Sequence, residues 1–387
     1  MIYLDNAAAT PLDDAIFEAM TPFLRGDYGN PGTLYSLGRK ARDAVETARE
    51  QVASFIGALP EQIIFTSGGA EANNLAVAGV IPHLKFFGKP EIVTTAIEHP
   101  TVRGAVIHAA GERCGFTHQF VFPDRYGEIS CYDIEERINK STGLVSVMFV
   151  NNETGTVNNV FDIGKACREN GVLFHTDCVQ AAPEIRLDVK EIGCDMLSVS
   201  SHKIHGPKGA GALFVKNKDI LAPLIYGSAS QEYGLRGGTL NVPAVVGFGK
   251  ACELMKNEDA RYTRAEEIKL IFYKEFLKRL GEIGVGFRVN GKSPENGGRI
   301  LNVCIPGFDA ETLVITLDNL GVCVSAGAAC NGAGQVPSRV LRAMGLSADE
   351  ARSSVRISFS HTNTEQEAVE AAALFQKALV FLLETCA

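Results

Sequence analysis

Helical and strand-like hydrophobic patterns alternate along the chain between about residues 40 and 260. Over 39–56, apolar residues recur at helical spacing, with Ala41, Val45 and Val52 on one face. This alternation predicts an α/β fold in which helices cover both faces of a mainly parallel, seven-stranded-type sheet. Such sheets bind ligands at the carboxyl ends of their strands. The expected strands lie at 62–66, 92–95, 144–150, 173–176, 196–199 and 212–215.

The pattern changes near residue 260. A long, charged amphipathic helix is expected over 260–280, and short strands are expected at 301–305, 321–324 and 355–359. Helical patterns separate these strands, which is typical of an α+β unit. We therefore predict a large domain over residues 15–260 and a small α+β domain made of residues 1–14 and 261–387.

The charge balance and the lack of long apolar runs argue against a nucleic-acid-binding, secreted or membrane-spanning protein. The chain has 387 residues, with 37 Lys and Arg against 45 Asp and Glu, a formal net charge of −8. A nucleic-acid binder normally has a basic face, so no direct nucleic-acid binding is predicted. The start of the chain lacks the basic and apolar regions of a secretory signal, and no apolar run approaches the roughly 20 residues that span a bilayer. We expect a soluble, cytoplasmic protein with no membrane partner.

The ten cysteines are scattered, without CxxC pairs or metal-ligand spacing. This usage is typical of reduced thiols in the cytosol, most of them small core residues. No metal site is therefore expected. The cysteines are Cys114, Cys131, Cys167, Cys178, Cys194, Cys252, Cys304, Cys323, Cys330 and Cys386.

Lys203 lies just after the expected strand at 196–199, between His202 and a Gly-Pro turn. A lysine amine that is desolvated or has cationic neighbours can form a Schiff base with an aldehyde cofactor. A solvated loop lysine is the alternative interpretation, since most lysines lie on the surface.

Other strand ends carry residues that suit a pyridine cofactor. Asp177 could keep a pyridine nitrogen protonated, although a helix cap is the alternative. Gln180 could point the same way. His99 could stack on an aromatic ring and exchange protons, or it could be an ordinary strand-end histidine. The turn at Gly68 and Gly69 opens a helix whose N–H groups attract phosphate, but it lacks the spacing of dinucleotide and nucleoside-triphosphate loops.

Taken together, these residues resemble the cysteine desulfurases of the NifS/IscS group, class V aminotransferases among the fold-type I pyridoxal-phosphate enzymes. The resemblance runs nearly from end to end, and its most specific part is the lysine motif at 200–209. The other matching segments are 3–11, 29–31, 65–74, 98–99, 150–155 and 175–180.

The resemblance implies pyridoxal 5'-phosphate as cofactor and gives each residue around its ring a role. Lys203 would form the Schiff base. Asp177 would face the pyridine nitrogen, and Gln180 would face the phenolic oxygen. His99 would stack on the ring.

The resemblance also implies a phosphate site and a homodimer. The phosphate would be held by Gly69 and Ala70 together with Ser200 and His202. Thr239 resembles a threonine that members of this group lend across the dimer interface, which implies shared active sites.

Cys330 lies in a Gly- and Ala-rich stretch over 324–335, which is typical of a loop. A thiol on a loop can be exposed as a thiolate, although a plain loop cysteine is the alternative. The stretch resembles the sulfur-accepting loop of the NifS/IscS subgroup, so Cys330 is expected to be the catalytic thiol. Cys323 fits a core position better.

Arg356 follows Val355 in an expected strand, and its guanidinium fork matches a carboxylate. The resemblance assigns Arg356 to the carboxylate of the substrate, with Asn152 assisting. An exposed strand arginine is the alternative.

The resemblance thus predicts a cysteine desulfurase that converts L-cysteine to L-alanine and holds the sulfur on Cys330 as a persulfide. A protein acceptor or scaffold would receive it for iron–sulfur cluster assembly, tRNA thiolation or DNA phosphorothioation, which the sequence does not separate. The alternatives are a selenocysteine lyase or another class V pyridoxal-phosphate enzyme, and an inactive scaffold for a sulfur-assembly partner.

The sequence departs from the group at several positions. Ala70 replaces the usual threonine, which removes one hydroxyl contact to phosphate, worth about 1 kcal/mol. Residues 228–230 read Ser-Ala-Ser where glycines are usual, and the thiol loop reads AGAAC. Tyr35 and Tyr233 replace a histidine and an arginine.

Overall fold

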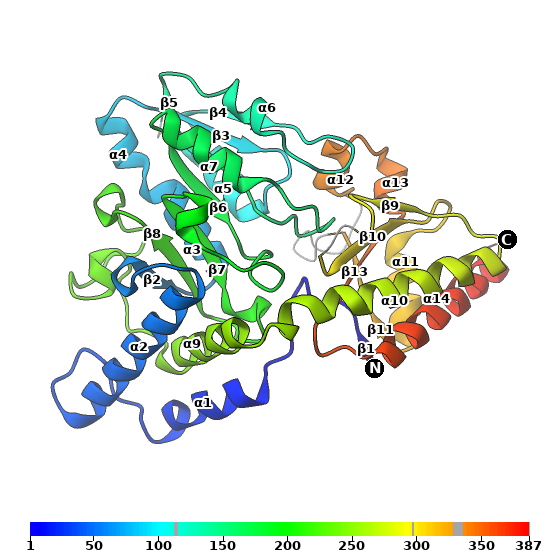
Figure 1. The fold of residues 1–387 in the computed structure, drawn as a ribbon, viewed down its shortest axis with the longest axis horizontal. Coiled ribbons are helices and arrows are strands. Elements are labelled where there is room, and N and C mark those ends of the chain that lie inside the picture. Colours follow the sequence, from blue (N-terminus) through cyan, green and yellow to red (C-terminus); the bar gives the residue numbers. More distant parts are fainter. Residues whose placement is uncertain (112–114, 296–297, 328–335, 387) are drawn as a thin grey trace.

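The computed structural model describes residues 1–111, 115–295, 298–327 and 336–386 of the chain. Figure 1 shows two units side by side, one built from roughly the first 260 residues and one from the remainder. The first strand, β1 (Ile2–Tyr3), belongs to the second unit, where it pairs in parallel with β11 (Val322–Cys323). The division into domains at 14/15 and 260/261 remains a prediction.

A seven-stranded sheet forms the centre of the first unit, in the order β2-β8-β7-β6-β5-β3-β4. Strand β8 is antiparallel to both of its neighbours, and the pairs from β7 to β4 are parallel. The predicted, mainly parallel sheet is thereby confirmed. Its strands are β2 (Ile63–Thr66), β3 (Glu91–Thr95), β4 (Thr117–Val121), β5 (Thr142–Ser146), β6 (Leu173–Asp177), β7 (Met196–Ser200) and β8 (Gly211–Val215).

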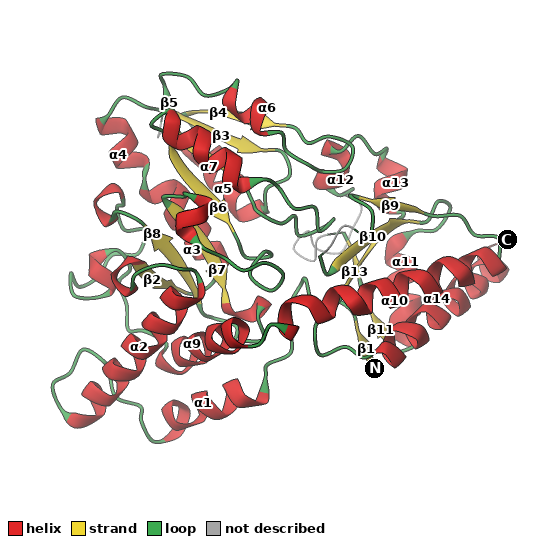
Figure 2. Ribbon diagram, in the orientation of Figure 1, coloured by secondary structure: helices red, strands yellow, loops and turns green. Residues whose placement is uncertain are grey.

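Helices cover both faces of this sheet (Figure 2), because successive strand residues point to opposite sides. Val145 packs into one apolar cluster and its neighbour Leu144 into the other. One face carries α1 (Asp14–Arg25), α2 (Ser36–Phe55), α7 (Val160–Glu169), α8 (Val189–Ile192) and α9 (Val242–Asn257), and the other carries α3 (Gly69–Gly79), α4 (Ile81–Phe86) and α5 (Pro100–Ala109). The short α6 (Cys131–Glu135) packs against α7.

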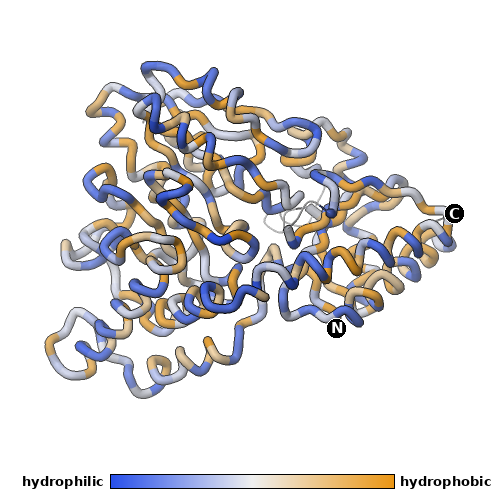
Figure 3. Tube along the Cα trace, in the orientation of Figure 1, coloured by the Kyte–Doolittle hydropathy of each residue, from blue (hydrophilic) through white to orange (hydrophobic). Residues whose placement is uncertain are grey.

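The second unit has an antiparallel sheet in the order β12-β13-β10-β9, packed on two long helices. Helix α10 carries hydrophilic and hydrophobic stretches in alternation (Figure 3) and packs along α14. Phe272 and Phe276 of α10 lie with ring centroids 5.4 Å apart in the core of this unit. The elements are α10 (Ala260–Glu282), β9 (Arg288–Asn290), β10 (Ile300–Cys304), α11 (Ala310–Asn319), β12 (Ser325–Ala326), α12 (Arg339–Ala343), α13 (Ala348–Arg352), β13 (Ser354–Ser358) and α14 (Glu365–Cys386).

Three details differ from the expected elements. The strand expected over 144–150 ends at Ser146, and β4 and β9 were not expected. Cys323 is only partly buried, so its expected core position is wrong. Within the described ranges, no helix combines the length and apolar character needed to cross a membrane.

Candidate active site

A cavity of about 200 Å³ lies at the carboxyl ends of β6 and β7. All candidate site residues from the sequence line it except Thr239 and Cys330. Thr239 borders a separate hollow with residues 228–233, and Cys330 lies outside the described residues. The candidates that line the cavity are Gly69, Ala70, His99, Asn152, Asp177, Gln180, Ser200, His202, Lys203 and Arg356.

The Lys203 side chain enters the cavity from a short 3-10 turn (Ser201–Lys203) after β7. Its Nζ donates to the carbonyl oxygens of Ala7 and Ala8, the latter at 2.8 Å. The N-terminal segment also holds the turn itself, since the Thr10 hydroxyl donates to the His202 carbonyl at 2.9 Å. The chain therefore presents a primary amine at a fixed place in the cavity.

Asp177, at the end of β6, is a buried residue, 4% exposed. Asn73 of α3 donates from Nδ2 to Asp177 Oδ2 at 2.7 Å, and the Val179 N–H donates to Oδ1 at 2.9 Å. These two donors fix the plane of the carboxylate. A carboxylate at this position can hold a cationic ring nitrogen.

Asn73 and Thr101 also line the cavity, although no motif in the sequence predicts a role for either. Asn73 Nδ2 also donates to Thr101 Oγ1 at 3.0 Å, and Thr101 Oγ1 lies 2.8 Å from His99 Nδ1. A chain of hydrogen bonds thus connects His99 to Asp177. One sequence feature could have pointed to Asn73: it lies one helical turn after Gly69, on the helix expected to bind phosphate.

His99 precedes α5 and caps it, since its Nδ1 accepts from the Thr101 N–H at 3.3 Å. Burial lowers the pKa of His99, an effect that the Asp177 carboxylate opposes and that Lys203 and Arg339 add to. The ring is therefore neutral near pH 7, with Nδ1 as acceptor and Nε2 as donor. A neutral imidazole can lie against an aromatic ring and take up a proton.

The turn between β2 and α3 has glycines where a side chain would block close approach of the backbone to its neighbours. Gly68 has φ 153°, which favours glycine, and a Cβ on Gly69 would lie 2.7 Å from Val179 Cγ2. The N-terminus of α3 lies beside Ser200, whose Oγ is 2.9 Å from His202 Nδ1. Burial lowers the pKa of His202 to about 4, so its ring is neutral. These donors suit an anion such as phosphate.

Arg356 of β13 brings a guanidinium from the second unit to the cavity. Its Nη2 donates to Asp5 Oδ1 at 2.8 Å and its Nη1 to the Asn152 carbonyl at 2.9 Å, while Nε has no hydrogen-bond partner among the described residues. The side chain is almost fully buried but lines the cavity, so an anion inside the cavity can pair with its charge. Asn152 lines the same wall.

Gln180, one turn beyond β6, is held on both sides of its carboxamide. Its Nε2 donates to the Ala7 carbonyl at 2.8 Å, and its Oε1 accepts from Arg299 Nη2 at 2.7 Å. The cavity is thus closed by residues from the N-terminal segment and from both units. Among the residues that the structure describes, no cluster of three or more His, Cys, Asp or Glu side chains could hold a metal ion.

Comparison with known proteins shows which family the chain resembles over its length. The protein family Aminotransferase class-V matches residues 2–371. The chain is 41% identical to "Putative cysteine desulfurase IscS 1" of Bacillus subtilis (strain 168), over 96% of each chain. Among solved structures, a NifS-like protein superposes with a TM-score of 0.89 at 32% identity, covering 98% of this chain and all of the other. "SspA in complex with cysteine" superposes with a TM-score of 0.81 at 36% identity, over 94% of this chain and all of the other.

Proposed function

This chain belongs to the class-V aminotransferase family, and we propose that it is a pyridoxal-phosphate-dependent cysteine desulfurase. The proposed reaction converts L-cysteine to L-alanine and moves the sulfur to Cys330 as a persulfide. The observation that carries the proposal is the convergence of Lys203, Asp177 and Arg356 on one cavity. An amine, a carboxylate and a guanidinium there match the aldehyde and ring nitrogen of the cofactor and the carboxylate of an amino acid.

The residues present fit pyridoxal phosphate. Gly69 leaves open a cradle that a Cβ would fill, at the N-terminus of α3 where N–H groups can hold the phosphate. Ala70, Ser200 and His202 line the same end, and His99 offers a neutral ring to stack. When bound, the cofactor supplies an electron sink for negative charge at the substrate α-carbon.

Lys203 is assigned two tasks by this arrangement. Its amine would hold the aldehyde of the cofactor, and as a free amine it would accept the proton from the substrate α-carbon. The Ala7 and Ala8 carbonyls hold the free amine on the cavity side, because they accept its hydrogen bonds.

Arg356 binds the substrate carboxylate, and Asn152 lies beside it. Asp5 and the Asn152 carbonyl hold the guanidinium plane, so one edge of the fork is fixed before substrate arrives. His99, neutral and protonated at Nε2, can donate that proton to the substrate and later recover one at the same nitrogen.

Cys330 accepts the sulfur in this scheme. Its thiolate attacks the substrate sulfur, so an S–S bond forms as the carbon–sulfur bond breaks, and the substrate carbon gains a proton to give alanine. One cysteine and one protein thiol thus give one alanine and one persulfide. The role of Cys330 is supported by the resemblance of its loop alone, since residues 328–335 lie outside the described ranges.

We also propose that the protein is a cytoplasmic homodimer and that a protein acceptor takes the sulfur. Thr239 supports the dimer, because it lies away from the cavity of its own chain, on a hollow of about 590 Å³ formed with residues 228–233 and 30–33. A partner chain docked there would bring Thr239 to the partner's cavity. Sedimentation at several protein concentrations would test this assembly.

The activity is tested by incubating the protein with pyridoxal phosphate and L-cysteine. We expect alanine release together with a mass increase of one sulfur atom on Cys330. The Lys203→Ala variant is expected to abolish both. The Cys330→Ser variant is expected to lose persulfide and nearly all alanine formation while keeping the cofactor's visible absorption. Full sulfur release by Cys330→Ser without added thiol would contradict the scheme.

A further inference from the structure

The carboxamide of Gln180 has one orientation, set by two contacts of opposite kind. The Ala7 carbonyl can only accept a hydrogen bond, so it requires Nε2, and the Arg299 guanidinium can only donate, so it requires Oε1. A flipped amide would place two acceptors together at Ala7 and two donors together at Arg299. The amide nitrogen therefore lies on the side of Ala7, which lines the cofactor cavity, and the oxygen lies on the side of Arg299, which does not.

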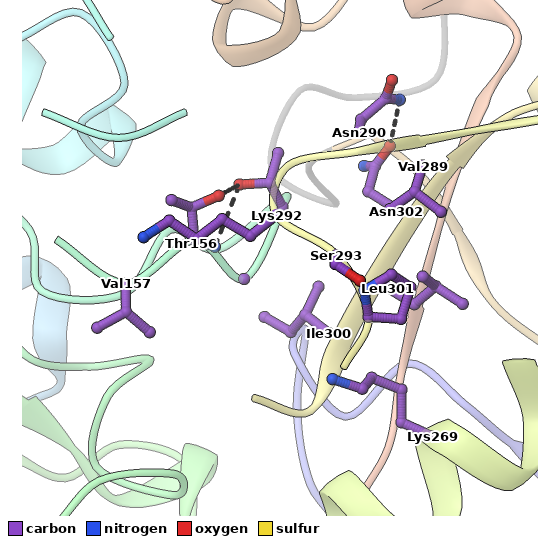
Figure 4. A pocket seen from close by; sticks show the side chains of 13 residues that line it. Thr156, Val157, Lys269, Val289, Asn290, Lys292, Ser293, Ile300, Leu301 and Asn302 are labelled. Carbon is purple, nitrogen blue, oxygen red and sulfur yellow. Dashed lines mark hydrogen bonds between the residues drawn. The ribbon is translucent and has the colours of Figure 1, made fainter. Parts of the chain in front are cut away.

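Arg299 reaches Gln180 from the second unit. It directly precedes Ile300 of β10, which together with Lys269 lines a separate cavity of about 160 Å³ (Figure 4). Its side chain is 2% exposed. Arginine side chains are rarely buried this completely unless they are paired with an anion. The burial of Arg299 beside Gln180 therefore needs a partner of opposite charge.

Glu184 is the partner that permits this burial. Its Oε1 lies 3.2 Å from Arg299 Nε, in an ion pair whose two side chains are both almost inaccessible. Residues 180 and 184 lie one turn apart after β6, where the Ile185 N–H donates to Ala181 O. The same guanidinium thus contacts both residues, with Nε toward Glu184 and Nη2 toward Gln180. Asp5 and Arg356 also act on its charge.

We propose that Arg299 is a positioning residue that fixes the Gln180 carboxamide, so that Gln180 presents a hydrogen-bond donor, and never an acceptor, to the cofactor. The Ala7 carbonyl takes one of the two N–H bonds of Nε2, and the second can reach into the cavity. This inference rests on the proposed function, in which Gln180 faces the phenolic oxygen of pyridoxal phosphate.

The consequence is a defined charge state for the bound cofactor. A donor to the phenolic oxygen stabilises negative charge there, and so favours loss of the proton that this oxygen shares with the neighbouring imine nitrogen. Without Arg299 the amide can turn, and a carbonyl oxygen then faces the phenolate. The proton should be held more tightly, and the pH midpoint of the cofactor's visible absorption should rise.

The test is a pH titration of the visible absorption of the cofactor-loaded protein, without substrate. In Arg299→Met the midpoint is expected to rise by about one pH unit, the scale of one charge-assisted hydrogen bond. This variant removes the cation paired with buried Glu184 and leaves only the more weakly placed Lys269 near it. The double variant Arg299→Met/Glu184→Met removes the ion pair as a unit and is expected to show the same rise. If circular dichroism shows that the double variant is folded and its midpoint is unchanged, the proposal is overturned.

A double-mutant cycle separates positioning from a direct effect of charge. Gln180→Leu alone should raise the midpoint, and adding the Arg299→Met/Glu184→Met pair to Gln180→Leu should raise it no further. A second, additive rise would mean that Arg299 acts on the cofactor without Gln180, and the inference would fail. If the wild type shows no visible band with pyridoxal phosphate, the proposed function itself fails. If the band forms and responds to cysteine while the variants titrate like wild type, only the role of Arg299 is lost.

Discussion

Arg356 and Asp5 form an ion pair across 351 positions of sequence, with 2.8 Å between Nη2 and Oδ1. The pair joins strand β13 to the segment after β1, at the wall of the cofactor cavity. Its geometry means that the guanidinium assigned to the substrate carboxylate is already oriented by another carboxylate. Whether Asp5 assists the substrate or competes with it can be measured.

We expect Asp5→Ala to lower kcat/KM for L-cysteine about tenfold, mainly through a higher KM. A hydrogen bond to a charged group contributes about 1.5–3 kcal/mol, and its loss frees the Arg356 fork to turn. Asp5→Asn keeps an acceptor oxygen and should show a smaller effect. Steady-state kinetics with saturating cofactor are the measurement. A KM below that of wild type would show that Asp5 competes with the substrate.

Ala70 offers a prediction of improved function. It lines the cavity at the start of α3, where the group usually carries threonine. Ala70→Thr adds a hydroxyl within reach of the phosphate, and a net gain of at least about 1 kcal/mol from one hydrogen bond corresponds to roughly fivefold or more tighter cofactor binding. Fluorescence titration of cofactor-free protein with pyridoxal phosphate would measure it. Ala70→Val, similar in size but without the hydroxyl, is the matched control and should bind no tighter than wild type.

The buried pair of Arg49 and Glu232 is predicted to dominate the stability of the segment before Thr239. Both carboxylate oxygens of Glu232 accept from Arg49, at 2.7 and 3.0 Å, and the Phe65 N–H donates to the same carboxylate at 2.6 Å. Arg49→Leu leaves a buried, unpaired carboxylate, so the free energy of unfolding should fall by about 3–5 kcal/mol.

Urea denaturation followed by circular dichroism would measure this loss. The variant Arg49→Leu/Glu232→Leu removes both charges and should cost less than Arg49→Leu alone. Arg264→Leu breaks two surface ion pairs, with Glu267 and Glu365, and should leave the midpoint nearly unchanged. Equal stability of Arg49→Leu and wild type would refute the prediction.

His205 is predicted to contribute to acid unfolding. The Pro11 carbonyl, 3.0 Å from Nδ1, can only accept, so Nδ1 carries the proton and Nε2 accepts from the Ser360 hydroxyl at 2.8 Å. Burial, aided by His361, lowers the pKa of His205 to about 3, against 6.5 in the unfolded chain. As the pH falls below 6.5, the unfolded state binds a proton that the folded state rejects. Stability is therefore lost between pH 6.5 and 3, by up to about 1.4 kcal/mol per pH unit.

The variant His205→Asn isolates this group. Asparagine tolerates the positive φ of 64° at this position and retains a side-chain donor for Pro11. Unfolding free energies measured from pH 7 to 4 should fall less steeply in the variant than in wild type. Parallel curves would mean that His205 titrates alike in both states.

The sequence contained enough to predict the sheet and most of the cavity, because strand ends and short motifs are local signals. Asp177 is the last residue of β6, and Lys203 and His99 lie three and four residues beyond the ends of β7 and β3. The end of β5 was misjudged for a physical reason: 147–150 is as buried and apolar as the strand before it, so hydrophobicity does not mark where Ser146 ends the regular pairing. Strand β4 lies at the sheet edge, partly exposed, and lacks an apolar run.

The residues that orient the site could not be predicted in the same way. Asn73, Asp5 and Arg299 act through hydrogen bonds that span 104, 351 and 119 positions. No periodicity or spacing in one sequence records such contacts. They depend on how the two units and the N-terminal segment come together, which only the fold defines.

The placement of the N-terminal segment also has a consequence during synthesis. Residues 2–8 are synthesised well before their partners in the fold, since β1 pairs with β11 and the carbonyls of Ala7 and Ala8 hold Lys203. Translation at about 5–20 residues per second separates the emergence of these partners by tens of seconds. A nascent chain that already carries the whole large sheet therefore still lacks a closed wall around its lysine. The cofactor would therefore meet a complete cavity only after Arg356 has been synthesised.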